Sequence, residues 1–404
     1  MKRSLLVFAL ALTILISSGL PVVSSQAAAV DRLDMSVDGA PDTPVVLCLP
    51  GIYMNDPVDC APAGPSAYLT QMAQKGITFP VPPVPVRSPD PALKQIDIRY
   101  GEVVTPNAPI YGSSEDALKG QKKLAVNHIR GEFTYISYSD MLEIDGKKLY
   151  MIDWNQWMTA ADVSRIGIVP QFQGKEFSRT PNIPFGWVLT YFYSAAQVET
   201  QRTPGYQGAE LTGHFLNLHD LVWVFDVQRV DDEDWYMVGP DEWVPQRVVA
   251  RVIPNTTPPE GVTGDRWIEV NLFEQTLAVY DRRQLIFATL IATGSEPFYT
   301  RPGVFQIYEK HDTTPMSGSF EADGSDAYYL QDVPWTMYFD DARALHGAYW
   351  RAKLGFPQSH GCVNMTVGDS HWLYNWAQVG DWVYVWDPSG QTPTDPEFYK
   401  GGGY

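Results

Sequence analysis

The chain has 404 residues and a formal net charge of −18, with 29 Lys and Arg against 47 Asp and Glu. A surface with this excess of negative charge repels phosphate polymers, which argues against nucleic acid or anionic lipid as a partner. Its length exceeds what one hydrophobic core usually serves, so we expect about two to four domains. Aromatic residues at 13%, with 32 Gly and 32 Pro, indicate a mainly β architecture of short strands and turns.

Residues 1–29 predict a secretory signal peptide. Lys2-Arg3 precedes an apolar run from Leu5 to Ile16, and small residues follow at Ala27 to Ala29. The apolar run is shorter than the roughly 18 residues that span a bilayer, so a transmembrane anchor is the less favoured interpretation. We therefore expect a secreted monomer, in the cell wall or periplasm, with no membrane attachment after cleavage.

The next segment, residues 30–95, contains two of the three cysteines. In an oxidising compartment an odd number of cysteines leaves one thiol without an intrachain partner. Cys48 and Cys60 flank a loop rich in turn-forming residues, so we predict a disulfide between them and a free thiol at Cys362. The proline-rich run at 79–91 predicts a stiff spacer before the next domain.

Residues 96–170 and 181–253 contain two copies of an internal repeat. Residues 150–166 align without gaps on residues 236–252, with Tyr, Met, Trp, Val and Arg at matching places. Each copy runs from an aromatic-Gly strand to a hairpin that carries tryptophan, and in this it resembles the bacterial SH3-like barrels of wall-associated proteins. The sequence therefore predicts two small β barrels.

The tryptophans of these copies have two interpretations. The resemblance implies that exposed aromatic side chains bind the cell wall. The alternative, at least as well supported by the sequence, is that the same side chains fill small hydrophobic cores. The residues concerned are Trp154, Trp157, Trp235 and Trp243.

Residues 262–387 predict the last domain, and residues 388–404 a polar tail. Alternating apolar residues over 267–280 predict a first hairpin, with further strands at 285–292 and 303–309 and a closing strand at 381–386. A capping box formed by Thr366 and Asp369 predicts the start of a helix.

The chemistry-bearing residues of this domain are Cys362 and His346. A free thiol titrates near 8.5, so a nucleophilic cysteine needs an imidazole or fixed amides to hold it as a thiolate. Gly361 before the cysteine permits a sharp turn that points backbone amides toward an oxyanion. We predict Cys362 as the nucleophile and His346 as the general base and acid that maintains the thiolate.

Two motifs, His346-Gly347 and residues 359–365, resemble the signature of the YkuD-type L,D-transpeptidases, and residues 266–305 resemble the start of the same domain. The resemblance implies a mostly β sandwich with one short helix. It also implies oxyanion or substrate-binding roles for Ser359, His360, Gly361, Asn364 and Gly347.

The sequence departs from the family pattern at two places. Arg301 stands where the family often has proline, and Gly347 stands where some members carry a serine thought to orient the histidine. A backbone carbonyl is an alternative orienting group.

The resemblance implies a peptidoglycan L,D-transpeptidase that releases D-alanine from a tetrapeptide stem, forms a cysteine thioester and passes it to an amine of a neighbouring stem. The alternatives are an L,D-carboxypeptidase that uses water, or a non-catalytic wall-binding protein. Papain-like enzymes place cysteine before histidine, and sortases need an arginine after the cysteine, which is absent here. A zinc site is disfavoured by cramped spacing of its candidate ligands, so we expect no metal and no cofactor; these ligands are His346, His360, Cys362 and His371.

Overall fold

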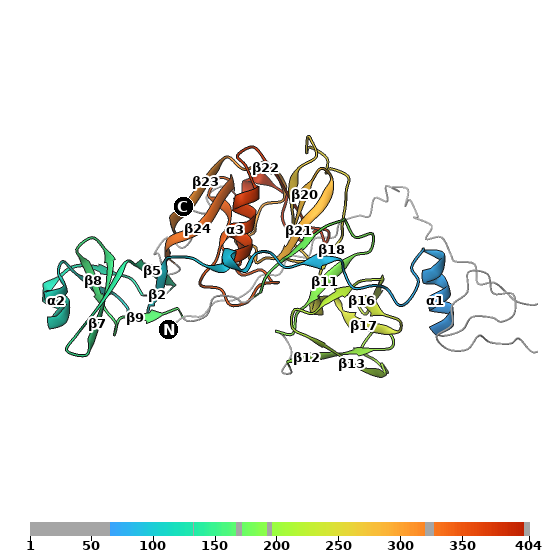
Figure 1. Ribbon diagram of the computed structural model, residues 1–404, viewed down its shortest axis with the longest axis horizontal. Coiled ribbons are helices and arrows are strands. Elements are labelled where there is room, and N and C mark those ends of the chain that lie inside the picture. Colours follow the sequence, from blue (N-terminus) through green and yellow to red (C-terminus); the bar gives the residue numbers. More distant parts are fainter. Residues whose placement is uncertain (1–64, 132, 167–171, 192–195, 320–326, 400–404) are drawn as a thin grey trace, which may run out of the picture. The chain divides into compact units, whose positions relative to one another are not determined.

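The computed structural model describes residues 65–131, 133–166, 172–191, 196–319 and 327–399 (Figure 1). The predicted signal peptide and the Cys48–Cys60 pair lie outside these residues. The described residues all belong to one compact unit, Leu47–Tyr404. Within the described ranges, no helix is both long enough and apolar enough to cross a membrane.

The predicted C-terminal domain is built from two sheets. The first is seven-stranded, in the order β1 (Val86–Arg87), β10 (Lys175–Phe177), β21 (Gln284–Leu290), β20 (Thr276–Asp281), β19 (Trp267–Asn271), β27 (Trp382–Trp386) and β22 (Gly303–Gln306). The second has the order β26 (Val363–Met365), β25 (Arg343–Gly347), β24 (Tyr328–Asp340), β5 (Thr134–Tyr138), β2 (Arg99–Val103) and β9 (Val163–Arg165), with β23 (Glu309–Gly318) also paired to β24.

A single apolar cluster joins the two sheets. Ile268 and Val279 from the first sheet pack in it with Leu345 and Met365 from the second, and Leu373 closes it from the helix side. The predicted hairpin, the later strands and the closing strand are confirmed, and β27 pairs in parallel with β19. The mainly β sandwich that the sequence predicted for this domain is therefore observed.

The proline-rich run at 79–91 does not form a free spacer. Val86 pairs with Phe177 in β10, and β10 in turn pairs with β21 of the first sheet. Val84, just before β1, is buried in a core cluster. Prolines are tolerated here because β1 is an edge strand, which needs only one row of hydrogen bonds.

The helix α3 (Val367–Trp376) begins directly after its N-cap Thr366, as predicted. The Thr366 hydroxyl accepts a hydrogen bond from the Asp369 amide at 3.1 Å. The Asp369 carboxylate accepts hydrogen bonds from the Gly174 amide at 2.9 Å and from the Thr289 hydroxyl at 2.6 Å. Burial raises the pKa of Asp369 to about 6. Asp369, the second residue of the predicted capping box, therefore also links the helix to the first sheet.

The internal repeat has a structural counterpart. Two five-stranded sheets share one strand order; they are β4 (Ala125–Ile129), β3 (Ala108–Tyr111), β8 (Gln156–Thr159), β7 (Lys147–Asp153) and β6 (Asp140–Ile144), and β13 (Leu211–Asn217), β12 (Gln197–Gln201), β17 (Glu242–Pro245), β16 (Glu233–Gly239) and β15 (Asp226–Val230). The ladder β5-β2-β9 is likewise matched by β14 (Leu221–Trp223), β11 (Phe185–Val188) and β18 (Val249–Val252). None of the described sheets closes on itself, so the SH3-like barrels are not confirmed.

The remaining elements are short. The helices are α1 (Pro65–Gln74) and α2 (Ser114–Lys119), and the 3-10 turns are η1 (Pro91–Lys94), η2 (Lys122–Leu124), η3 (Gln246–Val248) and η4 (Pro396–Tyr399).

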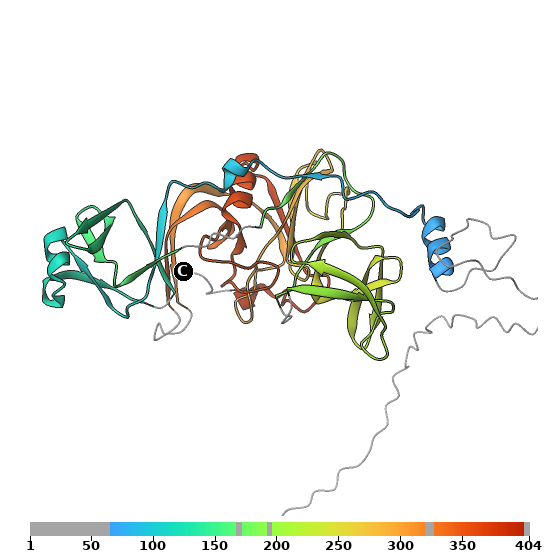
Figure 2. The same ribbon diagram turned by 60° about the horizontal axis from the view of Figure 1, so that its bottom comes forward.

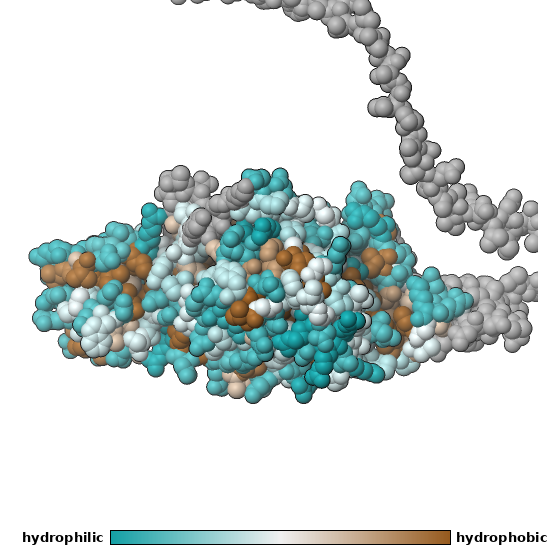
Figure 3. Space-filling view, turned by 90° about the horizontal axis from the view of Figure 1, so that it is seen from above, coloured by the Kyte–Doolittle hydropathy of each residue, from teal (hydrophilic) through white to brown (hydrophobic). Residues whose placement is uncertain are grey.

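The face shown in Figure 3 is mostly hydrophilic, with apolar residues in separate patches. A hydrophilic face is expected, because charged side chains are rarely buried in hydrophobic cores.

Three of the four tryptophans discussed above fill cores. Trp157, Trp235 and Trp243 are 9%, 1% and 3% exposed, whereas Trp154 is 81% exposed. Of these four tryptophans, only Trp154 therefore offers its ring to a ligand at the surface.

The first repeat is joined to the second sheet of the C-terminal domain by backbone pairing. Strand β5 runs parallel to β24, with Thr134 opposite Tyr329, and the two lie side by side in Figures 1 and 2. The Tyr100 ring stacks on the Tyr349 ring with centroids 3.5 Å apart, and its hydroxyl donates to the Asp332 carbonyl at 2.7 Å. Repeat 1 is therefore packed on this domain rather than tethered beside it.

The second repeat packs on the opposite sheet. Phe185 and Trp187 share a core cluster with Trp267 of β19. The buried Glu274 carboxylate accepts hydrogen bonds from the Tyr236 hydroxyl at 2.6 Å and the Arg251 guanidinium at 2.9 Å. Both repeats thus bury part of the sandwich.

We predict that Tyr100→Ala lowers the free energy of unfolding by about 3 kcal/mol, because it removes a buried ring from this contact. The exposed-aromatic control Trp154→Ala should change it by less than about 0.5 kcal/mol. Urea unfolding followed by tryptophan fluorescence measures both. Equal, small effects of the two substitutions would contradict the packing of repeat 1 through Tyr100.

Candidate active site

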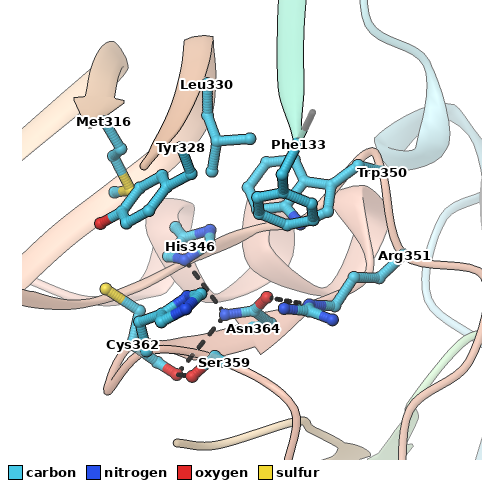
Figure 4. A pocket seen from close by; sticks show the side chains of 11 residues that line it. Phe133, Met316, Tyr328, Leu330, His346, Trp350, Arg351, Ser359, Cys362 and Asn364 are labelled. Carbon is cyan, nitrogen blue, oxygen red and sulfur yellow. Dashed lines mark hydrogen bonds between the residues drawn. The ribbon is translucent and has the colours of Figure 1, made fainter. Parts of the chain in front are cut away.

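One pocket brings together residues from the second sheet, from the segments next to its strands and from the first repeat (Figure 4). Strands β24, β25 and β26 supply its floor, and the segment between β25 and β26 supplies one side. The lining residues are Phe133, Met316, Tyr328, Leu330, His346, Trp350, Arg351, Ser359, His360, Cys362 and Asn364. Five of the predicted site residues lie in it, namely His346, Ser359, His360, Cys362 and Asn364.

His346 is placed by the parallel pairing of β25 with β26, which sets it directly opposite Asn364. Its side chain is buried, and its Nδ1 lies 3.3 Å from the carbonyl of Gly347. Its Nε2 lies 3.3 Å from the Asn364 amide nitrogen. A carbonyl can only accept and an amide nitrogen only donates, so Nδ1 carries the proton and Nε2 presents its lone pair.

Gly347 orients the histidine through its backbone, which settles the question raised by the missing serine. A Cβ at this position would lie 2.6 Å from the Ser370 hydroxyl and 3.1 Å from Cγ of Pro334. A serine therefore does not fit at this position without a shift of its neighbours. Gly347 itself lies behind the histidine and does not line the pocket.

Cys362 follows Gly361, whose φ of 116° is a conformation that other residues rarely adopt. The thiol is half-buried, and its recorded polar contact is to the Ala342 carbonyl at 3.7 Å. Burial raises the pKa of the Cys362 thiol, and the Ala344 backbone and the Arg343 charge offset part of this rise. Among the hydrogen bonds of the described residues, none joins the sulfur to His346, and Figure 4 draws none between them.

Burial also sets the charge state of His346. It lowers the pKa of the imidazole to about 4; the contact with the Gly347 carbonyl acts in the opposite direction, and the positive charge of Arg351 lowers the pKa further. The sequence predicted a thiolate maintained by His346. That prediction stays a prediction; the raised pKa of the thiol and the lowered pKa of the imidazole both act against a charged pair in the free protein.

Ser359 and Gly361 are used by the turn itself. The Ser359 hydroxyl accepts from the Gly361 amide at 3.2 Å and donates to the Cys362 carbonyl at 2.6 Å. The Gly361 carbonyl accepts from the Thr300 hydroxyl at 2.8 Å. In this arrangement both residues hold the conformation of the turn that carries Cys362, and the Gly361 amide is already engaged.

His360 packs between two aromatic rings at the edge of the pocket. Its ring stacks on Tyr328 with centroids 5.3 Å apart and lies 5.1 Å from the ring of Phe298. These contacts fit a residue that shapes the loop.

A cluster of charged residues lies behind the turn. Arg343 and Arg301 share the buried Asp340 carboxylate, and the Arg343 guanidinium stands 5.1 Å from the ring of Tyr399. Arg301, the departure from the family's proline, therefore has a partner in this chain. The sequence predicted a polar tail, yet Tyr399 of that tail is buried against the cluster.

His371 is not part of the pocket. Its ring stacks on Trp335 with centroids 3.9 Å apart, and its Nδ1 lies 3.2 Å from the Leu93 carbonyl. In the part of the chain that the structure describes, no group of three His, Cys, Asp or Glu residues could hold a metal ion.

Sequence reasoning missed six of the eleven lining residues, among them Phe133 and Arg351. Phe133 reaches the pocket because β5 pairs with β24, a long-range contact that no local pattern signals. Arg351 donates from Nε to the Asn364 side-chain oxygen at 2.6 Å, which fixes the orientation of that amide. The sequence offered one signal for Arg351, namely its position between the two motifs.

Comparisons with known proteins bear on the C-terminal domain. Residues 265–385 match one family model, described as YkuD, L,D-transpeptidase catalytic domain. A search of curated proteins found no match.

Solved structures show limited similarity. The chain is 25% identical to an L,D-transpeptidase (Yku) from Stackebrandtia nassauensis, covering 31% of this chain and 57% of that one with a TM-score of 0.26. It is 26% identical to the catalytic domain from E. faecium L,D-transpeptidase, covering 31% of this chain and all of that one with a TM-score of 0.28. For an L,D-transpeptidase from Mycobacterium smegmatis the identity is 15%, the coverage 54% and 93%, and the TM-score 0.29.

The chain thus spans little more than half of the Stackebrandtia protein. The family match, rather than these structural similarities, carries the assignment. It places residues 265–385 among the L,D-transpeptidase catalytic domains, in agreement with the motifs around His346 and Cys362.

Proposed function

We propose that this chain is a secreted peptidoglycan L,D-transpeptidase that forms cross-links through a thioester on Cys362. The observation that carries the proposal is the pocket that holds Cys362 and His346 within the domain matched by the family model. The donor is the tetrapeptide stem, and the acceptor is an amine of a neighbouring stem.

The first half of the reaction forms the thioester. Cys362 sulfur attacks the carbonyl of the third stem residue as its proton passes to Nε2 of His346. The carbon–nitrogen bond to D-alanine then breaks, and the same proton leaves with the D-alanine amine. Nε2 is the competent atom because Nδ1 is committed to the Gly347 carbonyl.

The second half transfers the acyl group. The acceptor amine attacks the thioester, gives its proton to His346 and forms the new amide, and the sulfur leaves and regains the proton. Water in place of the amine would give the carboxypeptidase alternative. A protein that only binds the wall would leave the pocket's chemistry unused.

Incubation of the mature protein with tetrapeptide-containing peptidoglycan tests the proposal. Mass spectrometry of the digested product should show free D-alanine and new cross-links at the third stem residue, both absent with Cys362→Ala. Tripeptide stems without cross-links would favour the carboxypeptidase. No change in the wall would contradict catalysis altogether.

The pKa shifts of Cys362 and His346 give a second prediction. Because burial raises the pKa of the Cys362 thiol, alkylation of the free protein by iodoacetamide should have its midpoint above the ordinary value of about 8.5. The imidazole is neutral above about pH 4, so His346→Ala should leave this midpoint nearly unchanged. It should still lower turnover by about 10²-fold to 10⁴-fold, since both proton transfers need it. A midpoint well below 8.5 in the wild type that rises in His346→Ala would establish a preformed thiolate instead.

Phe133 gives a third prediction, because the second repeat contains its counterpart. The registers of β2 with β5 and of β11 with β14 place Phe133 and His219 at equivalent positions, and both have left-handed φ values, 42° and 68°. His219 packs against Phe172 and its Nε2 lies 2.8 Å from the Tyr191 hydroxyl. Only Phe133 of the pair lines the pocket.

We expect Phe133→Ala to raise the rate of Cys362 acylation by bulky donors relative to slender ones by about tenfold, because it removes one wall of the pocket. His219→Ala, at the equivalent position, should leave the ratio unchanged. Competition between two carbapenems of different side-chain size, followed by intact-protein mass spectrometry, measures it. An unchanged ratio in both variants would show that Phe133 does not limit the pocket.

A further inference from the structure

Arg351 is a half-buried cation without an acidic partner among the described residues. Its guanidinium donates to the side-chain oxygens of Asn364 at 2.6 Å and Gln358 at 3.0 Å, and to the Gln358 carbonyl at 2.5 Å. All three acceptors are neutral. Arg251 and Arg343 each pair with a buried carboxylate, whereas Arg351 takes part in no ion pair within the described ranges.

A charge that loses much of its hydration without gaining a counter-ion is costly. Loss of hydration lowers the pKa of Arg351 to about 10. A guanidinium is nevertheless charged at neutral pH, and a fold that retains it in a pocket without a counter-ion carries a free-energy penalty. An anion that enters the pocket would remove this penalty.

The geometry selects the kind of anion. The guanidinium fork carries more N–H donors than these three hydrogen bonds use, and a carboxylate matches two adjacent donors. Apolar side chains, among them Phe133 and Trp350, line the same pocket and exclude water, which strengthens a charged hydrogen bond. In Figure 4 Arg351 lies on the far side of Asn364 from Cys362, so a peptide attacked at the thiol can extend toward it.

We propose that Arg351 binds a free carboxylate of the acyl-donor peptide. This inference rests on the proposed function and adds the group by which the pocket recognises its donor. The carboxylate has two sources in a tetrapeptide stem: the C-terminus of the departing D-alanine, or the side chain of a diamino acid that bears one.

The hydrogen bond from Arg351 to Asn364 also affects His346, the proposed general base. Arg351 fixes the Asn364 amide, whose nitrogen faces Nε2 of His346 at 3.3 Å, and its charge opposes protonation of that imidazole. A carboxylate beside Arg351 offsets this charge. Donor binding therefore makes it easier for His346 to accept the proton of Cys362.

The test compares three synthetic tetrapeptide donors: the free acid, its C-terminal amide, and the form amidated at the diamino-acid side chain. D-Alanine or D-alaninamide release with a fixed acceptor amine gives kcat/KM. In the wild type, one of the two amidations should lower kcat/KM by about tenfold or more, and this identifies the carboxylate that is bound. Arg351→Gln should lower kcat/KM for the free acid by about tenfold more than for that amide, so that the ratio of acid to amide approaches one, and Arg351→Lys should lie between.

Lys353→Gln is the matched control. It removes a positive charge from the same loop, but Lys353 is exposed, packs over the Tyr191 ring and does not line the pocket. Its ratio of acid to amide should equal that of the wild type.

Two outcomes overturn the proposal in distinguishable ways. Equal losses in Arg351→Gln on all three donors would mean that Arg351 only holds Asn364 and its loop, and the proposed function would stand without the inference. A wild-type protein that turns over none of the donors, although iodoacetamide still alkylates Cys362, would overturn the proposed function and the inference with it.

Discussion

The pocket depends on backbone pairing along the long strand β24. Its C-terminal end pairs with β25, which carries His346 and in turn aligns it with Asn364 of β26. Its N-terminal end pairs with β5 of the first repeat, which brings Phe133 to the same pocket, and β23 pairs along the opposite edge. Side-chain positions in a ladder follow from its register, so a one-residue slip in the pairing with β25 or β5 would turn the wrong face toward the thiol. The first repeat therefore contributes to the architecture of the pocket.

Burial, more than pairing of charges, sets the chemistry of the pocket. Burial lowers the pKa of His346 and raises the pKa of the Cys362 thiol, so both shifts favour the neutral forms. In the proposed reaction the two groups would then acquire charge only once substrate has entered the pocket. The charged groups that remain have distinct roles: Arg343 is neutralised by Asp340 behind the turn, and Arg351 stays unpaired beside the base.

Local patterns predicted what depends on local physics. Alternating apolar residues gave the β19–β20 hairpin, and Thr366 gave the start of α3, because strand faces and helix caps are properties of short segments. The motifs placed Cys362 and His346 together. The sequence did not reveal the edge pairing of Val86 or the approach of Phe133, since both depend on partners far along the chain. It also left open the orientation of His346, because a backbone carbonyl has no sequence signature.

In each repeat a residue with a left-handed φ lies just before a strand: Phe133 before β5 and His219 before β14. This arrangement has a consequence for how such proteins diversify. The turn sets the backbone direction of this position in both copies, so the two copies carry equivalent anchor points on one scaffold. In one copy a histidine packs against Phe172 and contacts Tyr191 of its own repeat; in the other a phenylalanine reaches a pocket of a different domain. A single codon at either anchor can thus alter what the repeat presents while the hydrogen-bonded framework stays intact.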